Sequence, residues 1–222
     1  MIELYHYIHC PFCVRVRMAF GALSVSYKSL PLPYNEEKSL IEMTGTKMLP
    51  IVKWQDGSAQ NESLDIIKKL DSENKLKLDV LDNQERVDEL NNLLDRLGSP
   101  IHNLVMPYWI YTQEFDETSR EYFQKKKEVK RGPFKDLMKN KKDFLKILAK
   151  EIMSFQNYLG PFYKSETLTI QDIMIASHLW GLYVLPEFQF PLKVHEYLQR
   201  VKQETKFDYH EDFFKDSNIR EF

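Results

Sequence analysis

Apolar and polar positions divide the chain into two parts with different periods. Up to about residue 74, alternating runs typical of strands are interleaved with runs typical of helices, whose apolar residues recur every three or four positions. Proline, glycine and polar turn residues separate these runs. The pattern predicts strands at 2–7, 25–30, 49–52 and 58–60 and helices at 14–23, 36–43 and from 64 onward. The order β-α-β-α-β-β-α therefore predicts an α+β first domain.

From Gln84 onward the apolar spacing is helical throughout, which predicts an all-α second domain. A leucine stripe from Leu90 to Leu97 marks its first helix, and Gly98-Ser99-Pro100 is expected to end that helix before a second apolar stretch. Thr169-Ile170-Gln171-Asp172 has the form of a capping box ahead of a nearly all-apolar run. Further helices are predicted at 117–129, 144–159, 173–185 and 192–201.

The same pattern places the domain boundaries. We expect domains at 1–74 and 85–222, joined by a linker at 75–84 that has little periodic apolarity. The segment from Phe207 to Phe222 is an aromatic, acidic tail that the pattern assigns to no element.

The composition fits a two-domain cytoplasmic protein. The 222 residues are 43% hydrophobic, which is ample for two cores without disulfides. The net charge of −2 gives no general attraction to nucleic acid or anionic membranes, so neither is an expected partner. The first residues show no charged region followed by an apolar run, and no apolar run is long enough to span a bilayer, so we expect neither secretion nor membrane insertion. The two cysteines lie in one motif, which fits a reducing cytoplasm.

Candidate chemistry concentrates in Cys10-Pro11-Phe12-Cys13, which holds both cysteines of the chain. Two cysteines separated by two residues are typical of a redox pair. The motif lies where the first strand ends and the first helix begins, and Pro11 suits the first helical position. Cys10 then faces unpaired N–H groups and the positive end of the helix dipole, which favour a thiolate. We expect Cys10 to be the nucleophile and Cys13, one turn on and more buried, to be the resolving thiol.

Two other uses of the same cysteines remain open at this point. A structural disulfide closing so short a loop would contribute only about 2 kcal/mol in the chain-entropy model, which is little for a chain with large cores. A zinc site would use His6 or His9 as further ligands. The sequence has no second Cys-x-x-C and no His-x₃₋₅-His, so we expect no bound metal.

The first 74 residues, with a Cys-x-x-C at the first strand-to-helix turn, resemble the thioredoxin-fold domain of glutaredoxins and glutathione transferases. The motif differs from the Cys-Pro-Tyr-Cys of dithiol glutaredoxins only in Phe12. In the second part, the segment 120–128, the following Gly132-Pro133-Phe134 and the Met106-Pro107 step resemble the two-domain bacterial glutaredoxins of the glutaredoxin 2 type. The resemblance implies a thioredoxin-like domain followed by an all-α glutathione-transferase-like domain.

The resemblance also implies a glutathione site in front of the active cysteine. Pro50 matches the cis-proline of this superfamily, which leaves the backbone of Leu49 free to pair with the peptide part of a bound tripeptide. Glu62-Ser63 matches the polar pair that holds the γ-glutamyl end, with Glu62 on the ammonium and Ser63 at a helix start on the carboxylate.

Two more residues complete this expected glutathione site. Lys47 is a candidate for holding the glycyl carboxylate, and Phe12 of the motif is expected to line the site. Taken singly, Pro50 fits an ordinary proline at a strand start, and Glu62-Ser63 fits an ordinary helix cap. Together, in order and around one Cys-x-x-C, they favour the glutathione site.

The function implied is that of a glutathione-dependent thiol–disulfide oxidoreductase. Its partners would be glutathione, as co-substrate rather than as a tightly bound cofactor, and glutathionylated or disulfide-containing proteins; the resemblance implies a monomer. One alternative is a cysteine-type glutathione transferase or dehydroascorbate reductase, although those enzymes usually lack the second cysteine. Another is a non-catalytic or iron–sulfur-binding protein of the same fold, which the stiffness of Pro11 disfavours.

Two further features receive structural interpretations. Between Lys125 and Lys146 stand ten Lys or Arg residues against three acidic ones, with few aromatic residues among them. This favours a solvated helical face over a docking surface for acidic proteins or nucleic acid. His178, inside the apolar run, is expected to be a core histidine with satisfied hydrogen bonds rather than a ligand.

Overall fold

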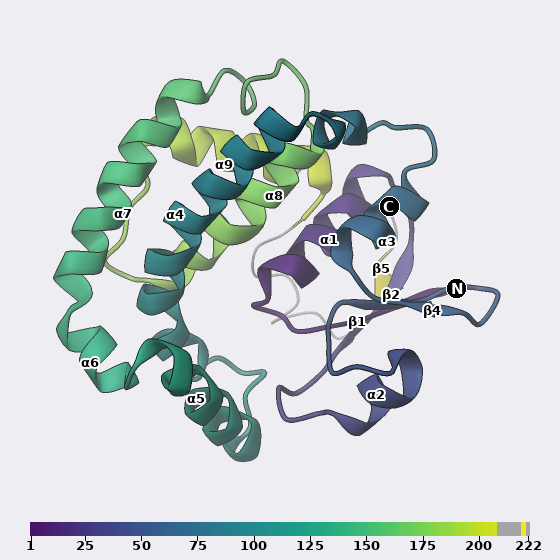
Figure 1. Ribbon diagram of the computed structural model, residues 1–222, viewed down its shortest axis with the longest axis horizontal. Coiled ribbons are helices and arrows are strands. Elements are labelled where there is room, and N and C mark those ends of the chain that lie inside the picture. The colour runs from purple at the N-terminus through teal and green to yellow at the C-terminus, as the bar shows by residue number, and fades with distance from the viewer. Residues whose placement is uncertain (208–218, 221–222) are drawn as a thin grey trace.

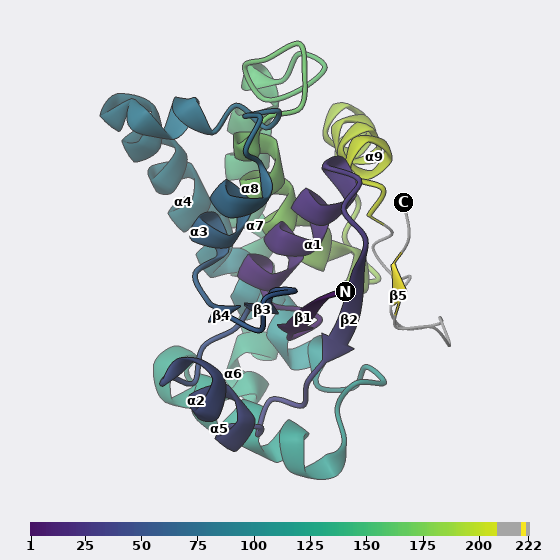
Figure 2. The same ribbon diagram turned by 90° about the vertical axis from the view of Figure 1, so that its right-hand side faces the viewer.

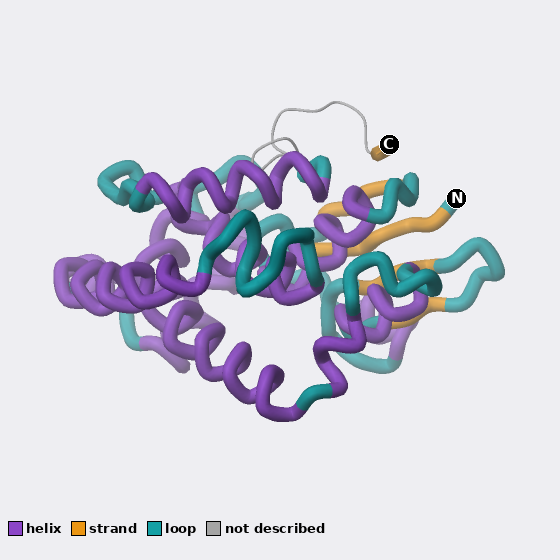
Figure 3. The backbone as a smooth tube through the Cα atoms, turned by 90° about the horizontal axis from the view of Figure 1, so that it is seen from above, coloured by secondary structure: helices purple, strands orange, loops and turns teal. Residues whose placement is uncertain are grey.

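The computed structural model describes residues 1–207 and 219–220, which form a sheet-centred part and a larger helical part (Figure 1). Residues 208–218 and 221–222, most of the unassigned tail, lie outside the described residues. The strands gather at one end of the molecule and helices fill the rest (Figure 3). Within the described residues, no helix is both long and apolar enough to cross a membrane.

The sheet mixes parallel and antiparallel strands in the order β4-β3-β1-β2-β5. Strand β1 (Ile2–His6) pairs in parallel with β2 (Tyr27–Pro31) and antiparallel with β3 (Ile51–Lys53), which continues antiparallel to β4 (Ala59–Gln60). The two-residue strand β5 (Ile219–Arg220) pairs antiparallel with β2 at the sheet's other edge. The predicted β-α-β-α-β-β-α order of the first part is confirmed.

Three helices cover this sheet. Helices α1 (Pro11–Ala22) and α3 (Ser63–Leu70) lie on one face and α2 (Lys38–Thr44) lies on the other (Figure 2). Helix α1 is buried along most of its length because α8 (Ile170–Leu179) and α9 (Leu192–Thr205) pack against it on the side away from the sheet. It is thus the element that joins the two parts, and one hydrophobic cluster runs through both.

The predicted break at Gly98-Ser99-Pro100 is wrong, because α4 runs without interruption from Gln84 to Trp109. Pro100 and Pro107 both lie inside it, where each lacks the N–H that would bond one turn back. The buried face of α4 packs against α7 (Lys141–Phe155) and α8. Burial of that face outweighs the local preference against helix, which the sequence pattern alone does not measure.

The remaining helices lie near their predicted positions, except that the helix predicted at 173–185 ends at Leu179 and continues as a 3₁₀ helix. The charged segment forms α5 (Glu117–Arg131), and a short α6 (Phe134–Lys139), too brief to show a period, follows it unpredicted. Short 3₁₀ helices lie at η1 (Leu78–Asp82), η2 (Gln156–Tyr158) and η3 (Trp180–Val184). Helix η1 falls within the predicted linker; the domain boundaries at 74 and 85 stay a prediction.

The capping box at the start of α8 is confirmed. The Asp172 carboxylate accepts from the Thr169 N–H at 2.8 Å and from the Tyr163 N–H at 2.7 Å. Burial raises the pKa of Asp172. The box fixes the entry of α8 into the core, where the helix contacts α1, α4 and α9.

Candidate active site

The cysteine motif lies at the turn from β1 to α1, as predicted. Cys10 has extended backbone angles, φ −71° and ψ 121°, and directly precedes the helix, whose first residue is Pro11. The Cys10 carbonyl accepts from the Val14 N–H at 2.9 Å, which closes the first helical turn. The Cys10 sulfur lies at the N-terminal end of the helix, near the backbone N–H groups of Phe12 and Cys13.

The two thiols differ in exposure and in acidity. Cys10 is partly exposed, whereas Cys13 is fully buried and accepts a long contact of 3.4 Å from the Tyr7 N–H. Burial raises the pKa of Cys13. The pKa of Cys10 falls to about 7, chiefly because the Cys13 thiol donates a hydrogen bond to it, with help from nearby backbone N–H groups and the charge of Lys127. Cys10 is therefore the more accessible and the more acidic thiol.

Both arginines of α1 are buried close to the motif. The Arg15 side chain is only 3% exposed, donates to Ser63 Oγ at 3.2 Å, and lies 5.0 Å from the centre of the Phe12 ring. Arg17 donates to the Ile8 carbonyl at 3.5 Å. Burial lowers the pKa of Arg15 to about 10, while the neighbouring Cys10 raises it. Arg15 thus supplies positive charge near the reactive sulfur and ties the motif to α3.

A cleft of about 410 Å³ opens over Cys10, between the sheet-centred part and helices α4 and α5. Four of the predicted site residues line it: Cys10, Phe12, Lys47 and Leu49. Phe12 is half exposed. Tyr7 and Tyr34, also in the lining, stack with ring centres 4.0 Å apart.

The loop from Lys47 to Pro50 forms one side of this cleft. The Leu49–Pro50 peptide bond is cis, as the resemblance implied, and both residues are buried. Lys47 Nζ donates to the Tyr122 hydroxyl at 2.6 Å and pairs with Glu37. The loop is thereby held against α5, which carries Tyr122.

The other predicted pair, Glu62-Ser63, lies at the start of α3. Ser63 is the first residue of the helix and is buried, while Glu62 is exposed and has a left-handed φ of 68°. Neither side chain is among those that line the Cys10 cleft in the described part of the chain. Ser63 is linked to the motif through its hydrogen bond with Arg15.

The two histidines that the sequence placed near the cysteines have partners of their own. His6 Nε2 lies 2.8 Å from Ser29 Oγ. His9 Nε2 lies 2.9 Å from Thr112 Oγ1, pairs with Glu114 and stacks on Trp109 with ring centres 4.9 Å apart. Both imidazoles therefore serve packing and hydrogen bonding.

Several cleft residues were missed by sequence reasoning. Lys126, Lys127, Lys130 and Arg131 line the cleft, although the basic segment was interpreted as a solvated face. Their density along α5 was the available signal, but helical periodicity does not tell which polar face meets another domain. The aromatic side chains of the cleft other than Phe12 have no local signal at all, because they come together only when distant segments pack; they are Tyr7, Tyr34, Trp109, Tyr122 and Phe123.

His178 also departs from its prediction. It is only partly buried, and it lines a second cavity beside the cleft. Its Nδ1 is buried without a hydrogen-bond partner in the described residues. Burial and the charge of Arg15 lower the pKa of His178 to about 3, so the ring is neutral.

A thioredoxin-like domain that begins its first helix at a Cys-x-x-C, followed by an all-helical domain that closes the cleft, defines the two-domain, glutathione-transferase-like class. Residues 4–77 match the family described as glutathione S-transferase, N-terminal domain. Residues 89–213 match the family described as glutaredoxin 2, C terminal domain. That second match covers more than half of the chain, which therefore belongs to the glutaredoxin 2 family.

One curated protein and two solved structures illustrate what the chain is similar to. Glutaredoxin 2 of Escherichia coli (strain K12) is 26% identical over 210 residues, covering 92% of this chain and 96% of that protein. A crystal structure of glutaredoxin 2 from Salmonella typhimurium, in complex with glutathione, superposes with a TM-score of 0.83 at 24% identity, covering 96% of this chain and 98% of that one. A glutathione transferase from Phanerochaete chrysosporium has a TM-score of 0.78 at 15% identity, covering 93% and 98% of the two chains.

Proposed function

We propose that the protein reduces glutathione mixed disulfides and protein disulfides, with glutathione as the reductant. The observation that carries this proposal is the Cys10 thiol, partly exposed in the cleft, with a pKa lowered to about 7 and a buried second thiol beneath it. A thiolate that forms near neutral pH is a good nucleophile toward disulfides. Family membership and a relative described in complex with glutathione support glutathione as the co-substrate.

The reaction proceeds by two thiol–disulfide exchanges. The Cys10 thiolate attacks the glutathione sulfur of a mixed disulfide, so that a Cys10–glutathione disulfide forms and the substrate cysteine leaves as a thiolate. A second glutathione thiolate then attacks the glutathione sulfur of that adduct, releasing oxidised glutathione and regenerating the Cys10 thiolate. One disulfide breaks as another forms at each step, so electrons balance without a further reductant.

Protein disulfides require the second thiol. Attack of Cys10 on such a disulfide leaves the substrate covalently attached, and Cys13 resolves this adduct by attacking Cys10 Sγ, which frees the substrate's second thiolate. Cys13 gives up its proton in that step. The resulting Cys10–Cys13 disulfide is reduced by two molecules of glutathione.

The proposed glutathione site uses the residues around the cleft. The backbone of Leu49 pairs with the peptide part of glutathione, Lys47 lies in the cleft where it can meet the glycyl carboxylate, and Phe12 borders the bound tripeptide. Ser63 and Glu62, at the start of α3, hold the γ-glutamyl carboxylate and ammonium. The Arg15–Ser63 hydrogen bond, which links the start of α3 to the cysteine motif, supports this arrangement.

The proposal is tested by steady-state reduction of a glutathionylated peptide with glutathione as the only reductant. We expect Cys10→Ser to lose activity to the uncatalysed background, because no other thiol is accessible in the motif. Cys13→Ser should keep much of the activity, since the first two exchanges do not use Cys13. Equal loss in both variants would contradict this division of roles. Conjugation of glutathione to electrophiles, without any mixed-disulfide reduction, would favour a transferase instead.

A further inference from the structure

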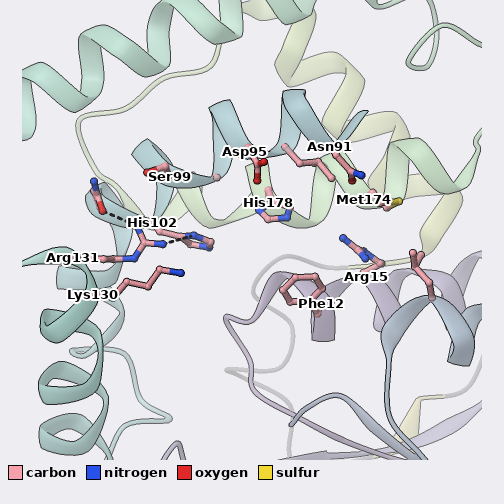
Figure 4. A pocket seen from close by; sticks show the side chains of 14 residues that line it. Phe12, Arg15, Asn91, Asp95, Ser99, His102, Lys130, Arg131, Met174 and His178 are labelled. Carbon is pink, nitrogen blue, oxygen red and sulfur yellow. Dashed lines mark hydrogen bonds between the residues drawn. The ribbon is translucent and has the colours of Figure 1, made fainter. Parts of the chain in front are cut away.

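A second cavity, of about 960 Å³, lies beside the Cys10 cleft (Figure 4). It is bounded by α1, α3, α4, α5 and α8, and it shares Phe12, His102, Lys130 and Arg131 with the cleft. A polypeptide whose cysteine reaches Cys10 therefore has a neighbouring space into which flanking side chains can extend. The proposed function does not use this cavity.

Three cationic side chains face the cavity from two directions. Figure 4 shows Lys130 and Arg131 reaching in from α5, and Arg15 reaching in from α1 on the opposite side. Among the described residues, none of the three has a carboxylate partner within salt-bridge distance. Asp95 is the single carboxylate that the described chain contributes to the lining. The cavity therefore carries a net positive charge that the described chain does not neutralise.

Arg15 is the strongest sign that this charge is complementary to a ligand. Its side chain is 3% exposed, it donates to the neutral hydroxyl of Ser63, and its Nε has no partner in the described residues. The nearby Cys10 thiolate favours the charged form of Arg15, but no carboxylate among the described residues pairs with it, so its desolvation is only partly offset. An anionic group entering the cavity would supply that missing partner.

The two histidines that line the cavity, His102 and His178, are neutral and lie beside its cationic side chains. Arg131 donates to Asn103 Oδ1 at 2.8 Å and lies 3.3 Å from His102 Nδ1, which must therefore accept. Burial lowers the pKa of both His102 and His178 to about 3, with smaller contributions from Arg131 and Arg15 respectively. Burial is the main reason that both imidazoles are neutral, and the cationic side chains beside them oppose a metal cation and attract an anion.

We propose that this cavity binds acidic side chains that flank the disulfide-bonded cysteine of a polypeptide substrate, so that the protein prefers disulfides in acidic sequence context. This inference rests on the proposed function. Cations on two sides fit more than one carboxylate, and the volume lies at the upper end of that of ligand sites. The amide side chains of Asn91 and Asn103 in the lining can pair with a peptide backbone, and exposed Phe12 offers an apolar surface beside it.

The test uses two glutathionylated peptides that differ only in having Glu or Gln at the residues on either side of the cysteine. The measured quantity is the ratio of kcat/KM for the Glu peptide to that for the Gln peptide, which cancels any general loss of activity. Binding of matched peptides with Ser in place of the cysteine is measured alongside by fluorescence anisotropy. Lys130, exposed and without a hydrogen-bond or ion-pair partner in the described residues, is a suitable site for substitution.

We expect the wild type to prefer the Glu peptide by both measures. Lys130→Glu should lower the ratio about three- to tenfold, because it replaces an attraction by a repulsion. Asp95→Asn should raise the ratio, since it removes the repelling carboxylate. Lys125→Glu makes the same charge change on an exposed part of α5 outside both cavities and should leave the ratio unchanged.

The outcomes separate this inference from the proposed function. Reduction of both peptides at equal rates, or equal effects of Lys130→Glu and Lys125→Glu, would overturn the acidic site while leaving the oxidoreductase activity intact. Reduction of neither peptide, with the Glu preference in binding retained and lost in Lys130→Glu, would support the acidic site and contradict the oxidoreductase activity. Free glutamate can be added as a competitor. Inhibition of peptide reduction by free glutamate, without any difference in kcat/KM between the Glu and Gln peptides, would also overturn the proposal.

Discussion

Cys10 and Cys13 are one helical turn apart, yet their environments push their acidities in opposite directions. Cys10 directly precedes the helix and is partly exposed. Cys13, in the first turn, is fully buried and packs with Leu40, Leu49 and Ile51. The Cys13 thiol, kept protonated by burial, is then the main stabiliser of the Cys10 thiolate. The role of each cysteine thus depends on the other, and not only on the helix dipole that the sequence suggested.

The coupling predicts a change in pH dependence when the donor is removed. In the wild type the rate of Cys10 alkylation by iodoacetamide should rise with pH and reach half its maximum near pH 7, where the thiolate forms. In Cys13→Ala the donor is lost and the thiolate is less stable, so the pKa of Cys10 rises and the half-maximum moves to higher pH. A Cys10 thiol that is a tenfold weaker acid would be alkylated about five times more slowly at pH 7.

Alkylation measured in Cys10→Ser gives the background for this experiment. An unchanged or lower pKa in Cys13→Ala would show that the backbone and Lys127, rather than the Cys13 thiol, control the acidity of Cys10.

Among the elements, α1 and α4 show where local sequence rules succeed and where packing overrides them. Pro11 at the first helical position and Cys10 directly before the helix follow from rules that involve only neighbouring residues, and both were predicted. The continuity of α4 through Pro100 was not predicted, because it depends on the helices that pack against α4. In α4, Gly98 faces the His178 ring, which a Cβ added at this position would meet first.

The two helical glycines Gly21 and Gly98 differ in how closely the neighbouring helix approaches them. Substitution of each by alanine tests this difference. A Cβ at Gly21 of α1 would lie 1.8 Å from the Thr205 carbonyl oxygen at the end of α9, so Gly21→Ala must push the two helices apart. We expect a loss of about 3 kcal/mol in the free energy of unfolding, despite the roughly 1 kcal/mol that alanine gains over glycine in helices.

Gly98→Ala is the matched control. The added Cβ would lie 3.4 Å from His178 Nδ1, which is an ordinary contact, so stability should stay within about 1 kcal/mol of the wild type or rise. Urea unfolding of both variants measures these values. A Gly21→Ala protein as stable as Gly98→Ala would contradict the close packing of α1 on α9.

At the scale of the whole molecule, the active site is a cleft between the sheet-centred part and the helical part. On the sheet side, the predicted residues Cys10, Phe12, Lys47 and Leu49 line the cleft, because they belong to a motif and a loop with recognisable local patterns, whereas Glu62 and Ser63 do not line it. The sequence did not predict the helical side. Trp109 and the basic residues of α5 line the cleft because α4 and α5 pack against the first domain. The hydrophobic periodicity of the sequence does not predict that packing.

The same limit explains the second cavity. The uncompensated charge of Arg15, Lys130 and Arg131 arises from helices far apart in the sequence. The basic segment was visible, but its orientation was not. If the cavity binds acidic flanks as proposed, the two domains divide the work: the first carries the chemistry, and the surface between them selects the substrate.

The central claim, that Cys10 takes glutathione from a mixed disulfide, is tested most directly by trapping the adduct. The Cys13→Ser variant, mixed with a glutathionylated peptide and no free glutathione, should gain the mass of one glutathione in its intact mass spectrum, with release of one reduced peptide. Peptide mapping should place the glutathione on Cys10, and the Cys10→Ser variant should gain none. An adduct of Cys10 with the peptide instead, or the absence of any adduct, would contradict the claim.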